Sequence, residues 1–392
     1  MDVGKRILSG ALALFLLLGA MGISARALDV PAPSAILVER TTGTVLYENN
    51  ADELLAPASV TKVMTLLLVM EAIDDGRIGW QDKVTASEAA AAKGGSQVYL
   101  KVGETMTVEE MVKSVTVSSA NDCACALAEH LAGSEGAFVE RMNARAKELG
   151  MENTHFVNCT GLDDSPEAAE HRTTARDIAI MSRELLGHED IKKYTTIWMD
   201  TVRDGAFGLS NTNKLVRFYE GTTGLKTGFT AGAGYCLSAS AERDGMELIA
   251  VVLKCASSQD RFQAAKGLLD YGFASFALAP AQPEEPLPQV EVLLGKEPSL
   301  QPVVRGEEGV LVDKSLRSQV TYEVSLPESV QAPVSPGQRL GTLTIRAGGQ
   351  VLAELPLAAP EAVERKSYGD LLWQLLGRIC MSGERIGGNA QK

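Results

Sequence analysis

A nearly unbroken apolar run from Val63 to Met70 follows directly on a lysine, Lys62, and no other feature constrains the fold as strongly. The run is long enough for a helix that is buried on most sides, and Pro57 suits the turn before it. A helix buried in this way needs other elements packed around it. Because an ammonium group is costly to desolvate, a lysine at the head of such a helix indicates a chemical role.

The elements that could cover this helix lie on both sides of it in the sequence. Four segments with strand character are Ala35–Glu39, Thr44–Tyr47, Gly234–Ala241 and Leu248–Leu253. Helical periodicity predicts helices over 108–131, 135–149, 174–186 and Asp260–Tyr271. Strands at both ends with helices between predict an α/β (α+β) domain over residues 28–279, in which the N- and C-terminal strands pair within one sheet.

The composition changes after residue 279. Residues 280–288 are rich in proline and predict a semi-rigid linker. Residues 289–360 alternate apolar and polar side chains between glycine turns, which predicts a small all-β domain. The last segment, 361–392, contains a short amphipathic helix.

That helix, predicted over Tyr368–Ser382, has one apolar face formed by Leu372, Leu375, Leu376 and Ile379, with Trp373 beside it. It is too short to span a membrane but suits peripheral contact with one. Residues 364–392 carry five basic and three acidic side chains, which favours an anionic lipid surface. The alternative is that the same leucines pack on the chain's own β-domain.

The N-terminus predicts export from the cytoplasm. Lys5 and Arg6 precede an apolar run from Ile7 to Ile23, and Ala25-Arg26-Ala27 offers a cleavage site after Ala27. Residues 1–27 are therefore predicted to be a signal peptide, with an uncleaved membrane anchor as the alternative. The net charge of −13 and the lack of a basic run exclude a nucleic-acid-binding surface.

The cysteines and histidines predict neither a metal nor another cofactor. The six cysteines form no C-x-x-C pair, and most are interpreted as small buried hydrophobic residues. The four histidines lack metal-ligand spacing, and His171 is expected to make a structural hydrogen bond. The sequence also lacks G-x-S-x-G and H-E-x-x-H, which argues against an α/β-hydrolase and a zinc peptidase.

Ser59-Val60-Thr61-Lys62 is the chain's single S-x-x-K motif. Residues three apart share a helix face, so Lys62 can reach the Ser59 hydroxyl. Burial lowers the pKa of a lysine and makes it a usable general base near neutral pH. Taken alone, the motif could also be a solvated pair on an exposed first turn.

Two more polar motifs stand in apolar surroundings. Ser119-Ala120-Asn121 can supply a second hydroxyl to relay a proton and an amide to hold a substrate, or it can be a turn or cap. Lys226-Thr227-Gly228 is expected to begin a strand. Its lysine and threonine can hold a carboxylate, and its glycine is expected to permit close approach of a bound backbone, unless the motif is a simple turn at a strand start. The three motifs in this order are far less expected by chance than any one alone.

At these residues the sequence resembles the low-molecular-mass penicillin-binding proteins, which are serine-type D-alanyl-D-alanine carboxypeptidases. The resemblance covers most of the chain after residue 27. Pro57–Thr65 matches the family's nucleophile segment closely, and Gly224–Thr230 matches its third motif. Ser119–Asp122 matches the second motif, where the family usually has Gly at the position of Ala120. Further matching segments are Thr160–Asp163, His171–Asp177, Asn211–Leu215 and Pro336–Gly341. The resemblance implies a penicillin-binding, β-lactamase-like transpeptidase fold, with an antiparallel sheet, a helical subdomain and a following β-domain.

The resemblance also implies a mechanism. Ser59 would attack the carbonyl between two D-alanines of a peptidoglycan stem peptide while Lys62 takes its proton. Ser119 would pass a proton to the leaving amine and Asn121 would orient the substrate. Lys226 and Thr227, which precede Gly228, would hold the terminal carboxylate. The backbone N–H groups of Ser59 and Phe229 would form the oxyanion hole. β-Lactams would acylate the same serine.

Three other functions compete with this interpretation. A β-lactamase shares the nucleophile, but the E-x-x-L-N string of class A enzymes does not occur in the sequence. A non-catalytic receptor for β-lactams or wall peptides would need an output element, and an intact set of motif residues favours turnover. An endopeptidase that cuts cross-links has a similar scissile bond, and the sequence does not separate it from a carboxypeptidase.

Overall fold

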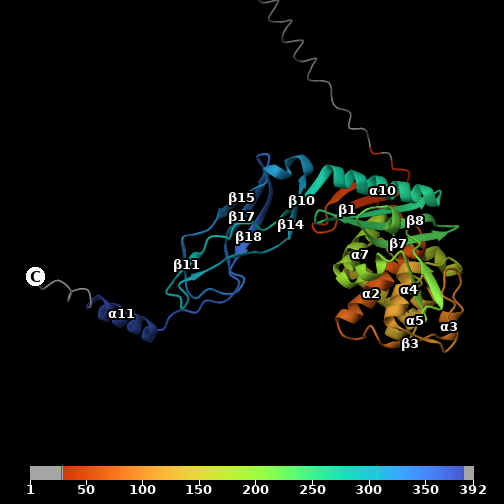
Figure 1. The fold of residues 1–392 in the computed structure, drawn as a ribbon, viewed down its shortest axis with the longest axis horizontal. Coiled ribbons are helices and arrows are strands. Elements are labelled where there is room, and N and C mark those ends of the chain that lie inside the picture. The colour runs from red at the N-terminus through yellow and green to blue at the C-terminus, as the bar shows by residue number, and fades with distance from the viewer. Residues whose placement is uncertain (1–27, 29, 307, 384–392) are drawn as a thin grey trace, which may run out of the picture.

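The computed structural model describes residues 28, 30–306 and 308–383, with side chains described as far as residue 376. Figure 1 shows three parts in a row: a large domain of helices and sheet, a smaller β-rich domain, and a single helix at the far end. The predicted signal peptide over residues 1–27 lies outside the described residues.

Five antiparallel strands form the central sheet of the large domain, in the order β2-β1-β9-β8-β7. They are β1 (Ser34–Glu39), β2 (Val45–Asn49), β7 (Thr222–Thr230), β8 (Gly234–Arg243) and β9 (Met246–Cys255). β1 pairs with β9, with Ile36 opposite Val251, so the predicted pairing of the N- and C-terminal strands is confirmed.

Both faces of this sheet are covered. Successive side chains of a strand point to opposite faces, and Ile36 and Leu37 accordingly belong to two different apolar clusters. On one face the cluster is completed by α10 (Ser258–Ser275), which extends the predicted helix over Asp260–Tyr271 at both ends. On the other face α7 (Ala175–Gly187) packs against β1 and β9 and begins the helical layer.

The helical layer surrounds α2 (Lys62–Asp74), of which nine residues are buried. Its neighbours include α5, α6 and α7. The longer helices of the layer are α4 (Val108–Ser118), α5 (Asn121–Ala132) and α6 (Glu135–Glu148). The apolar run after Lys62 therefore forms the buried helix that the sequence predicts.

The prediction of a single helix over 108–131 is wrong, because this segment forms two helices. α4 ends at Ser118 and α5 begins at Asn121. Between them Ser119 has a φ of 64°, the left-handed conformation that terminates a helix. The apolar residues on both sides of the turn are buried, so their periodicity runs through the break and conceals it.

Short elements connect these layers. The short helices are η1 (Ala58–Thr61), α3 (Glu88–Ala91), η2 (Pro166–Glu170), η3 (Glu189–Ile191), α8 (Lys192–Thr195) and α9 (Leu215–Phe218). Two small hairpins are formed by β3 (Lys83–Thr85) with β4 (Thr105–Thr107), and by β5 (Met199–Val202) with β6 (Phe207–Ser210). Of these elements, η1 leads directly into α2 and carries the first motif.

The smaller domain is built from strands, as predicted. A four-stranded sheet has the order β13-β18-β17-β15, and a three-stranded sheet has the order β12-β11-β16. The elements are β11 (Val290–Leu293), β12 (Ser299–Leu300), β13 (Val303–Val304), β14 (Gly309–Asp313), η4 (Lys314–Gln319), β15 (Thr321–Ser325), β16 (Ser329–Gln331), β17 (Arg339–Ala347) and β18 (Gln350–Ala358). One of its apolar cores contains Leu343, Ile345 and Leu357.

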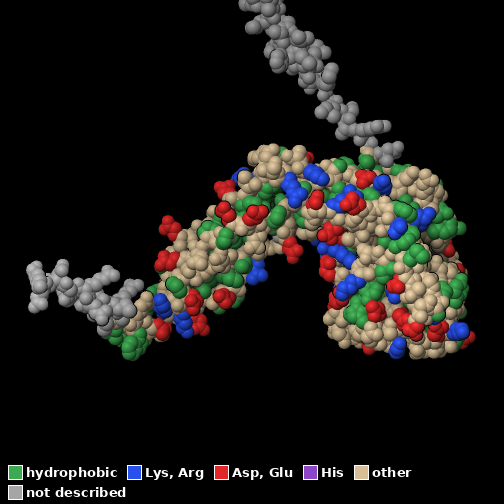
Figure 2. Space-filling view, in the orientation of Figure 1, with side chains coloured by type: hydrophobic (Ala, Val, Ile, Leu, Met, Phe, Trp, Pro, Cys, Tyr) green, Lys and Arg blue, Asp and Glu red, His purple; other side chains and the backbone are tan. Residues whose placement is uncertain are grey.

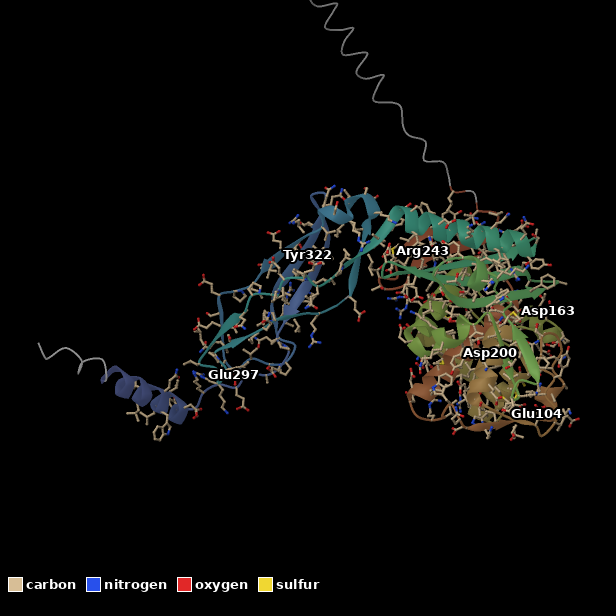
Figure 3. All side chains as sticks on the ribbon, in the orientation of Figure 1. Glu104, Asp163, Asp200, Arg243, Glu297 and Tyr322 are labelled. Carbon is tan, nitrogen blue, oxygen red and sulfur yellow. The ribbon has the colours of Figure 1, made fainter. Side chains whose placement is uncertain are left out.

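The two domains are joined by β10 (Phe276–Pro280), which leaves α10 and pairs with β14 of the smaller domain. The following residues 281–289 have no regular structure, but Ala281 and Leu287 pack into the β-domain core. Across the junction the Tyr322 hydroxyl donates to the Pro280 carbonyl over 2.8 Å. Figure 3 labels Tyr322 on the smaller domain and Arg243 on the large one.

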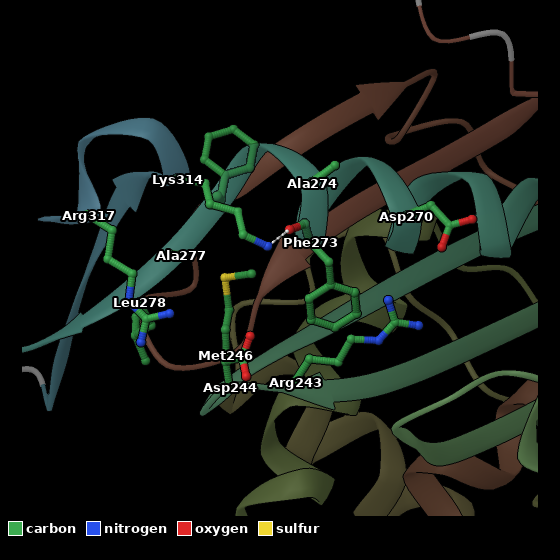
Figure 4. A pocket seen from close by; sticks show the side chains of 11 residues that line it. Arg243, Asp244, Met246, Asp270, Phe273, Ala274, Ala277, Leu278, Lys314 and Arg317 are labelled. Atoms are coloured by element: carbon green, nitrogen blue, oxygen red, sulfur yellow. Dashed lines mark hydrogen bonds between the residues drawn. The ribbon is translucent and has the colours of Figure 1, made fainter.

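A cavity lies beside this junction, between the C-terminal end of α10 and η4 (Figure 4). Lys314 reaches across from η4 and donates to the Phe273 carbonyl over 2.7 Å. Arg243 lies against the ring of Phe273, 4.7 Å from its centroid. Lys314 of the smaller domain and Arg243 of the large one thus both contact Phe273.

The tail forms α11 (Tyr368–Gly383), which stands at the end of the β-domain away from the large domain (Figure 1). Leu372, Trp373, Leu375 and Leu376 are between 43% and 76% exposed, and hydrophobic side chains are visible where α11 leaves the β-domain (Figure 2). The predicted contribution of Ile379 to this face lies outside the described side chains. Within the described residues no helix is both long enough and apolar enough to cross a membrane.

Candidate active site

The serine and lysine of the first motif lie where η1 continues into α2. One turn separates them, so they point to the same side, and Lys62 Nζ donates to Ser59 Oγ over 2.9 Å. Ser59 is partly exposed, whereas Lys62 is completely buried. The pair therefore presents a hydroxyl to an incoming substrate with the amine behind it.

Burial changes the acid–base chemistry of Lys62. Loss of hydration of the ammonium form lowers the pKa of Lys62 from 10.5 to about 7, although the negative charge of Asp122 acts in the opposite direction. Nζ also donates to the Thr160 carbonyl over 2.8 Å, which fixes its position. Near neutral pH a substantial fraction of Lys62 is a free amine that can accept the Ser59 proton.

His171 supports the first motif and does not contact Ser59. The Val157 N–H donates to its Nδ1 over 3.2 Å, so Nε2 carries the proton and donates to Thr61 Oγ1 over 2.8 Å. Burial, followed by nearby positive charges, lowers the pKa of His171 to about 4. His171 is thus a neutral hydrogen-bonding residue, as expected from the sequence.

The second motif lies at the turn between α4 and α5. The left-handed conformation of Ser119 ends α4, and Asn121 begins α5 with its side chain buried. Asn121 Nδ2 donates to the Gly94 carbonyl over 2.7 Å, and its backbone N–H donates to Ser96 over 2.7 Å. Asn121 Oδ1 is buried and has no hydrogen-bond partner within the described residues. This oxygen can therefore accept a hydrogen bond from a bound molecule.

Asp122 holds the loop that borders this motif, a role that sequence reasoning missed. Its buried carboxylate accepts hydrogen bonds from the backbone N–H groups of Val98, Leu100 and Cys123, at 2.9 to 3.2 Å. These bonds position residues 94–100 against the start of α5. The only signal in the sequence is an acidic residue at the start of an apolar helix, which is also typical of an ordinary first turn.

The third motif lies in the middle of β7, so the prediction that it begins a strand is wrong. Lys226 and Thr227 are buried there, and β7 runs against η1. At Gly228 a Cβ atom would lie 2.6 Å from the Pro57 carbonyl oxygen and 3.1 Å from the Ser59 nitrogen. The glycine therefore allows the chain's own η1 to approach β7, and this contact brings the first and third motifs together.

Thr212 links the second motif to the third. Its backbone N–H donates to the Val117 carbonyl over 3.1 Å, two residues before Ser119. Its hydroxyl accepts a hydrogen bond of 2.7 Å from Thr227 Oγ1. Thr212 lies in Asn211–Leu215, one of the segments that resemble the family. Its role as a link between two motifs can be recognised only in the folded structure.

Arg261 is the main site residue that sequence reasoning missed. It extends from α10 and is 7% exposed, and its NH1 donates to the Gly228 carbonyl over 2.9 Å. Its Nε is buried without a partner among the described residues. Desolvation, followed by the positive charges of Lys62 and Arg261, lowers the pKa of Lys226 well below 10.5. No local motif marks Arg261, because β8 and β9 lie between β7 and α10 and place Arg261 33 residues after Gly228 in the sequence.

Phe229 follows the third motif and is 53% exposed, with its ring 4.3 Å from that of Tyr235 between centroids. Phe229 directly follows Gly228, whose Cβ position lies 3.1 Å from the Ser59 nitrogen, and the oxyanion hole formed by the backbone N–H groups of Ser59 and Phe229 stays a prediction. The structure brings the first and third motifs together at Gly228, and Thr212 links the turn that carries Ser119 to Thr227. Together with Arg261, the motifs supply a hydroxyl backed by an amine, a second hydroxyl, a free amide oxygen and two further basic side chains. This set suits acyl transfer on an anionic substrate.

The comparisons with known proteins agree with this chemistry. The family model described as D-alanyl-D-alanine carboxypeptidase matches residues 21–257, and that described as penicillin-binding protein 5, C-terminal domain, matches residues 280–365. The D-alanyl-D-alanine carboxypeptidase DacF of Bacillus subtilis (strain 168) is 42% identical over 351 residues, which cover 88% of this chain and 89% of that protein.

Solved structures show the same fold. Penicillin binding protein 5 from Haemophilus influenzae has a TM-score of 0.73 and 29% identity, covering 86% of this chain and 98% of that one. Penicillin-binding protein D2 from Listeria monocytogenes, in its ampicillin-bound form, has a TM-score of 0.57 and 34% identity, covering 62% of this chain and 98% of that one. The large domain therefore has the penicillin-binding fold, with a β-domain after it.

Proposed function

The chain belongs to the D-alanyl-D-alanine carboxypeptidase family of serine peptidases, and we propose that it uses Ser59 to remove the terminal D-alanine from peptidoglycan pentapeptide stems. The observation that carries the assignment of Ser59 is the hydrogen bond of 2.9 Å from a completely buried lysine, with a pKa of about 7, to a partly exposed serine hydroxyl. The rest of the site explains how a stem peptide would be held and cleaved.

Acylation begins when the neutral amine of Lys62 accepts the proton of Ser59 and the serine oxygen attacks the carbonyl between the two D-alanines. The backbone N–H groups of Ser59 and Phe229 stabilise the oxyanion. Ser119 passes a proton to the leaving amine, so D-alanine departs as a free amino acid. Water then hydrolyses the acyl-enzyme and regenerates Ser59.

The substrate's terminal carboxylate binds at β7. Lys226 provides a buried amine and Thr227 a hydroxyl, and Arg261, which donates to the Gly228 carbonyl, adds a guanidinium group. Lys226 Nζ has only one protein partner, the Thr227 carbonyl at 3.0 Å, among the described residues. An arriving carboxylate would restore the charged form of Lys226, because an adjacent negative charge raises a lysine pKa.

Asn121 Oδ1 is the acceptor for a backbone N–H of the stem peptide, since it is the buried amide oxygen that no protein group satisfies. β-Lactams carry an amide, a strained acyl group and a carboxylate in a similar order, and would acylate Ser59. The Listeria monocytogenes relative was solved with ampicillin and with cefotaxime bound, which supports β-lactam binding here.

The enzyme is proposed to act outside the cytoplasm, at the cell wall or on the outer face of the membrane. The support is the predicted signal peptide over residues 1–27 and the exposed apolar face of α11. The leucines of α11 that the structure describes do not pack on the β-domain, which favours peripheral lipid contact over docking. The β-domain would then hold the active site away from the lipid surface.

Mass spectrometry of pentapeptide muropeptides after incubation with the purified enzyme tests this function. We expect each substrate to lose the mass of one alanine, and we expect no loss with Ser59→Ala. Cleavage of cross-linked dimers without shortening of pentapeptides would assign an endopeptidase instead. Rapid turnover of a chromogenic cephalosporin with no muropeptide product would assign a β-lactamase.

A further inference from the structure

Two cysteines and a glutamate converge beside the active site from three separate elements. Cys125 lies on α5, Glu135 lies in the first turn of α6, and Cys159 directly precedes Thr160. The two sulfur atoms and a carboxylate oxygen all lie within 4.8 Å of one another. Both thiols are free and buried, and they donate to the Glu135 carboxylate over 4.0 Å and 3.2 Å.

We propose that Cys125, Glu135 and Cys159 bind one thiophilic divalent cation, of the class to which Zn²⁺ and Cd²⁺ belong. Thiolate and carboxylate are both zinc ligands, at about 2.3 Å and about 2.0–2.2 Å from the ion. Around a tetrahedral ion, such bonds separate the ligand atoms by about 3.5–3.8 Å. A small adjustment of side chains already within 4.8 Å reaches that spacing.

Lys93 makes the site electrically suited to a divalent ion. Its Nζ donates to Glu135 over 2.6 Å, and the two charges cancel while both thiols are protonated. Binding follows M²⁺ + 2 RSH → M(SR)₂ + 2 H⁺, so the ion replaces two protons. The net charge of the four side chains and the ion therefore stays at zero, which avoids the penalty of an uncompensated buried charge.

Lys93 and Glu135 form the solvent-exposed part of the cluster. Their side chains are 21% and 23% exposed, whereas Cys125 and Cys159 are buried. Three protein ligands leave a fourth position on a tetrahedral ion for water. Because two thiol protons must leave, the affinity should rise with pH.

The site is connected to both halves of the catalytic machinery. Cys159 directly precedes Thr160, whose carbonyl accepts a hydrogen bond from Lys62, and the Cys159 carbonyl accepts one of 2.6 Å from Thr65. Lys93 directly precedes Gly94, whose carbonyl accepts from Asn121. A bound ion that draws Cys125, Glu135 and Cys159 together would therefore shift the partners of Lys62 and Asn121, and we infer that it slows acylation of Ser59.

Titration of the purified, reduced chain with Cd²⁺ tests binding, with the ultraviolet thiolate-to-cadmium charge-transfer band as the readout. We expect one Cd²⁺ per chain and competition by Zn²⁺. Cys125→Ser or Cys159→Ser should weaken binding by at least about 100-fold, since loss of even an outer-shell partner commonly weakens it 10- to 100-fold. Cys255→Ser and Cys380→Ser are matched controls and should leave the stoichiometry at one.

Glu135→Gln keeps the side-chain shape and removes the charged ligand, so it gives a second test if a cysteine variant fails to fold. Absence of the band, or a band that persists in Cys125→Ser and Cys159→Ser, would overturn the site. So would a thiol titration that finds Cys125 and Cys159 already joined as a disulfide in the isolated, unreduced protein.

Coupling is tested by the rate of penicillin acylation with and without saturating Zn²⁺. We expect a rate at least twofold lower with Zn²⁺ in the parent chain and no change in Cys125→Ser. This part rests on the proposed roles of Ser59 and Lys62, whereas the cadmium band does not. An unchanged acylation rate with Zn²⁺ bound would refute the coupling, and absence of any penicillin adduct would refute the proposed function while leaving the binding result intact.

Discussion

The helices α2 and α11 break the usual distribution of side chains in opposite ways. α2 begins with a lysine, Lys62, that is completely buried. α11 presents Leu372, Trp373, Leu375 and Leu376 to solvent at the far end of the chain. The first arrangement costs desolvation of an ammonium group, and the second leaves apolar surface in water.

The comparison shows where function is located in this chain. In α2 the unfavourable burial lowers the pKa of Lys62, which suits the proposed role of Lys62 as the base. In α11 the exposed apolar face lacks an internal partner within the described residues, which suits the proposed contact with a lipid surface. Function at α2 should depend on single atoms, whereas function at α11 should depend on a face.

The strongest test of this contrast is substitution of the catalytic pair. Lys62→Ala should lower the rate of penicillin acylation by about 100- to 10 000-fold, because it removes the general base. Ser59→Ala should remove the covalent adduct altogether. Intact-mass analysis after exposure to penicillin measures both. An adduct that persists in Ser59→Ala would show that another residue is the nucleophile.

Lys226 should show a somewhat smaller effect, confined to recognition of the carboxylate. Loss of a charge-assisted contact in a shielded site costs about 2–4 kcal/mol, so Lys226→Ala should lower kcat/KM by about 30- to 1000-fold. The exposed Lys214 gives a matched control, and Lys214→Ala should have no effect.

A substrate pair sharpens this prediction. The parent enzyme should prefer a peptide with a free terminal carboxylate to the same peptide with a terminal amide, and Lys226→Ala should lose most of that preference. Equal discrimination by the variant would contradict the role of Lys226, whatever the absolute rates are.

The pH dependence tests whether burial makes Lys62 a base. Burial lowers the folded-state pKa of Lys62 from 10.5 to about 7, and the reactive form is the neutral amine. The acylation rate should therefore rise with pH by about 50-fold between pH 5 and pH 7, and level off above that. Stopped-flow acylation with a chromogenic β-lactam measures it, and a rate that is flat from about pH 5 to 9 would point to another base.

The tail should have the smallest effect on chemistry. Truncation after Glu364 should release the enzyme from anionic vesicles in a flotation assay, while hydrolysis of a soluble pentapeptide stays unchanged. Unfolding or loss of soluble activity on truncation would place the helix within the fold.

Single substitutions test whether the face of α11 matters more than its charge. Leu375→Glu and Gln374→Glu change the net charge equally, but only the first lies on the apolar face. Leu375→Glu should weaken vesicle binding markedly, and Gln374→Glu should weaken it only slightly. Equal effects of the two variants would mean that charge alone drives the contact.

Much of the architecture could be predicted from the sequence, because it depends on local patterns. The apolar run after Lys62 and the strands at both ends of the large domain reflect nearly continuous burial, and the alternation in the β-domain reflects burial of one face. Prediction failed where one residue adopts a special conformation. Ser119 divides the predicted helix over 108–131, and its left-handed φ of 64° leaves no mark in the periodicity on either side.

The proposed reacting groups can be predicted from the amino-acid sequence: the pair Ser59 and Lys62, and the residues of the two later motifs. Their spacing within each motif is short enough for local geometry to place them together. How the motifs meet, and which other residues join them, depends on the tertiary structure. Gly228 permits β7 to approach η1. Arg261 contacts Gly228 of β7, and Asp122 contacts the backbone at Leu100, and both contacts join residues more than 20 positions apart in the sequence. Such contacts depend on packing between elements, which no local pattern encodes.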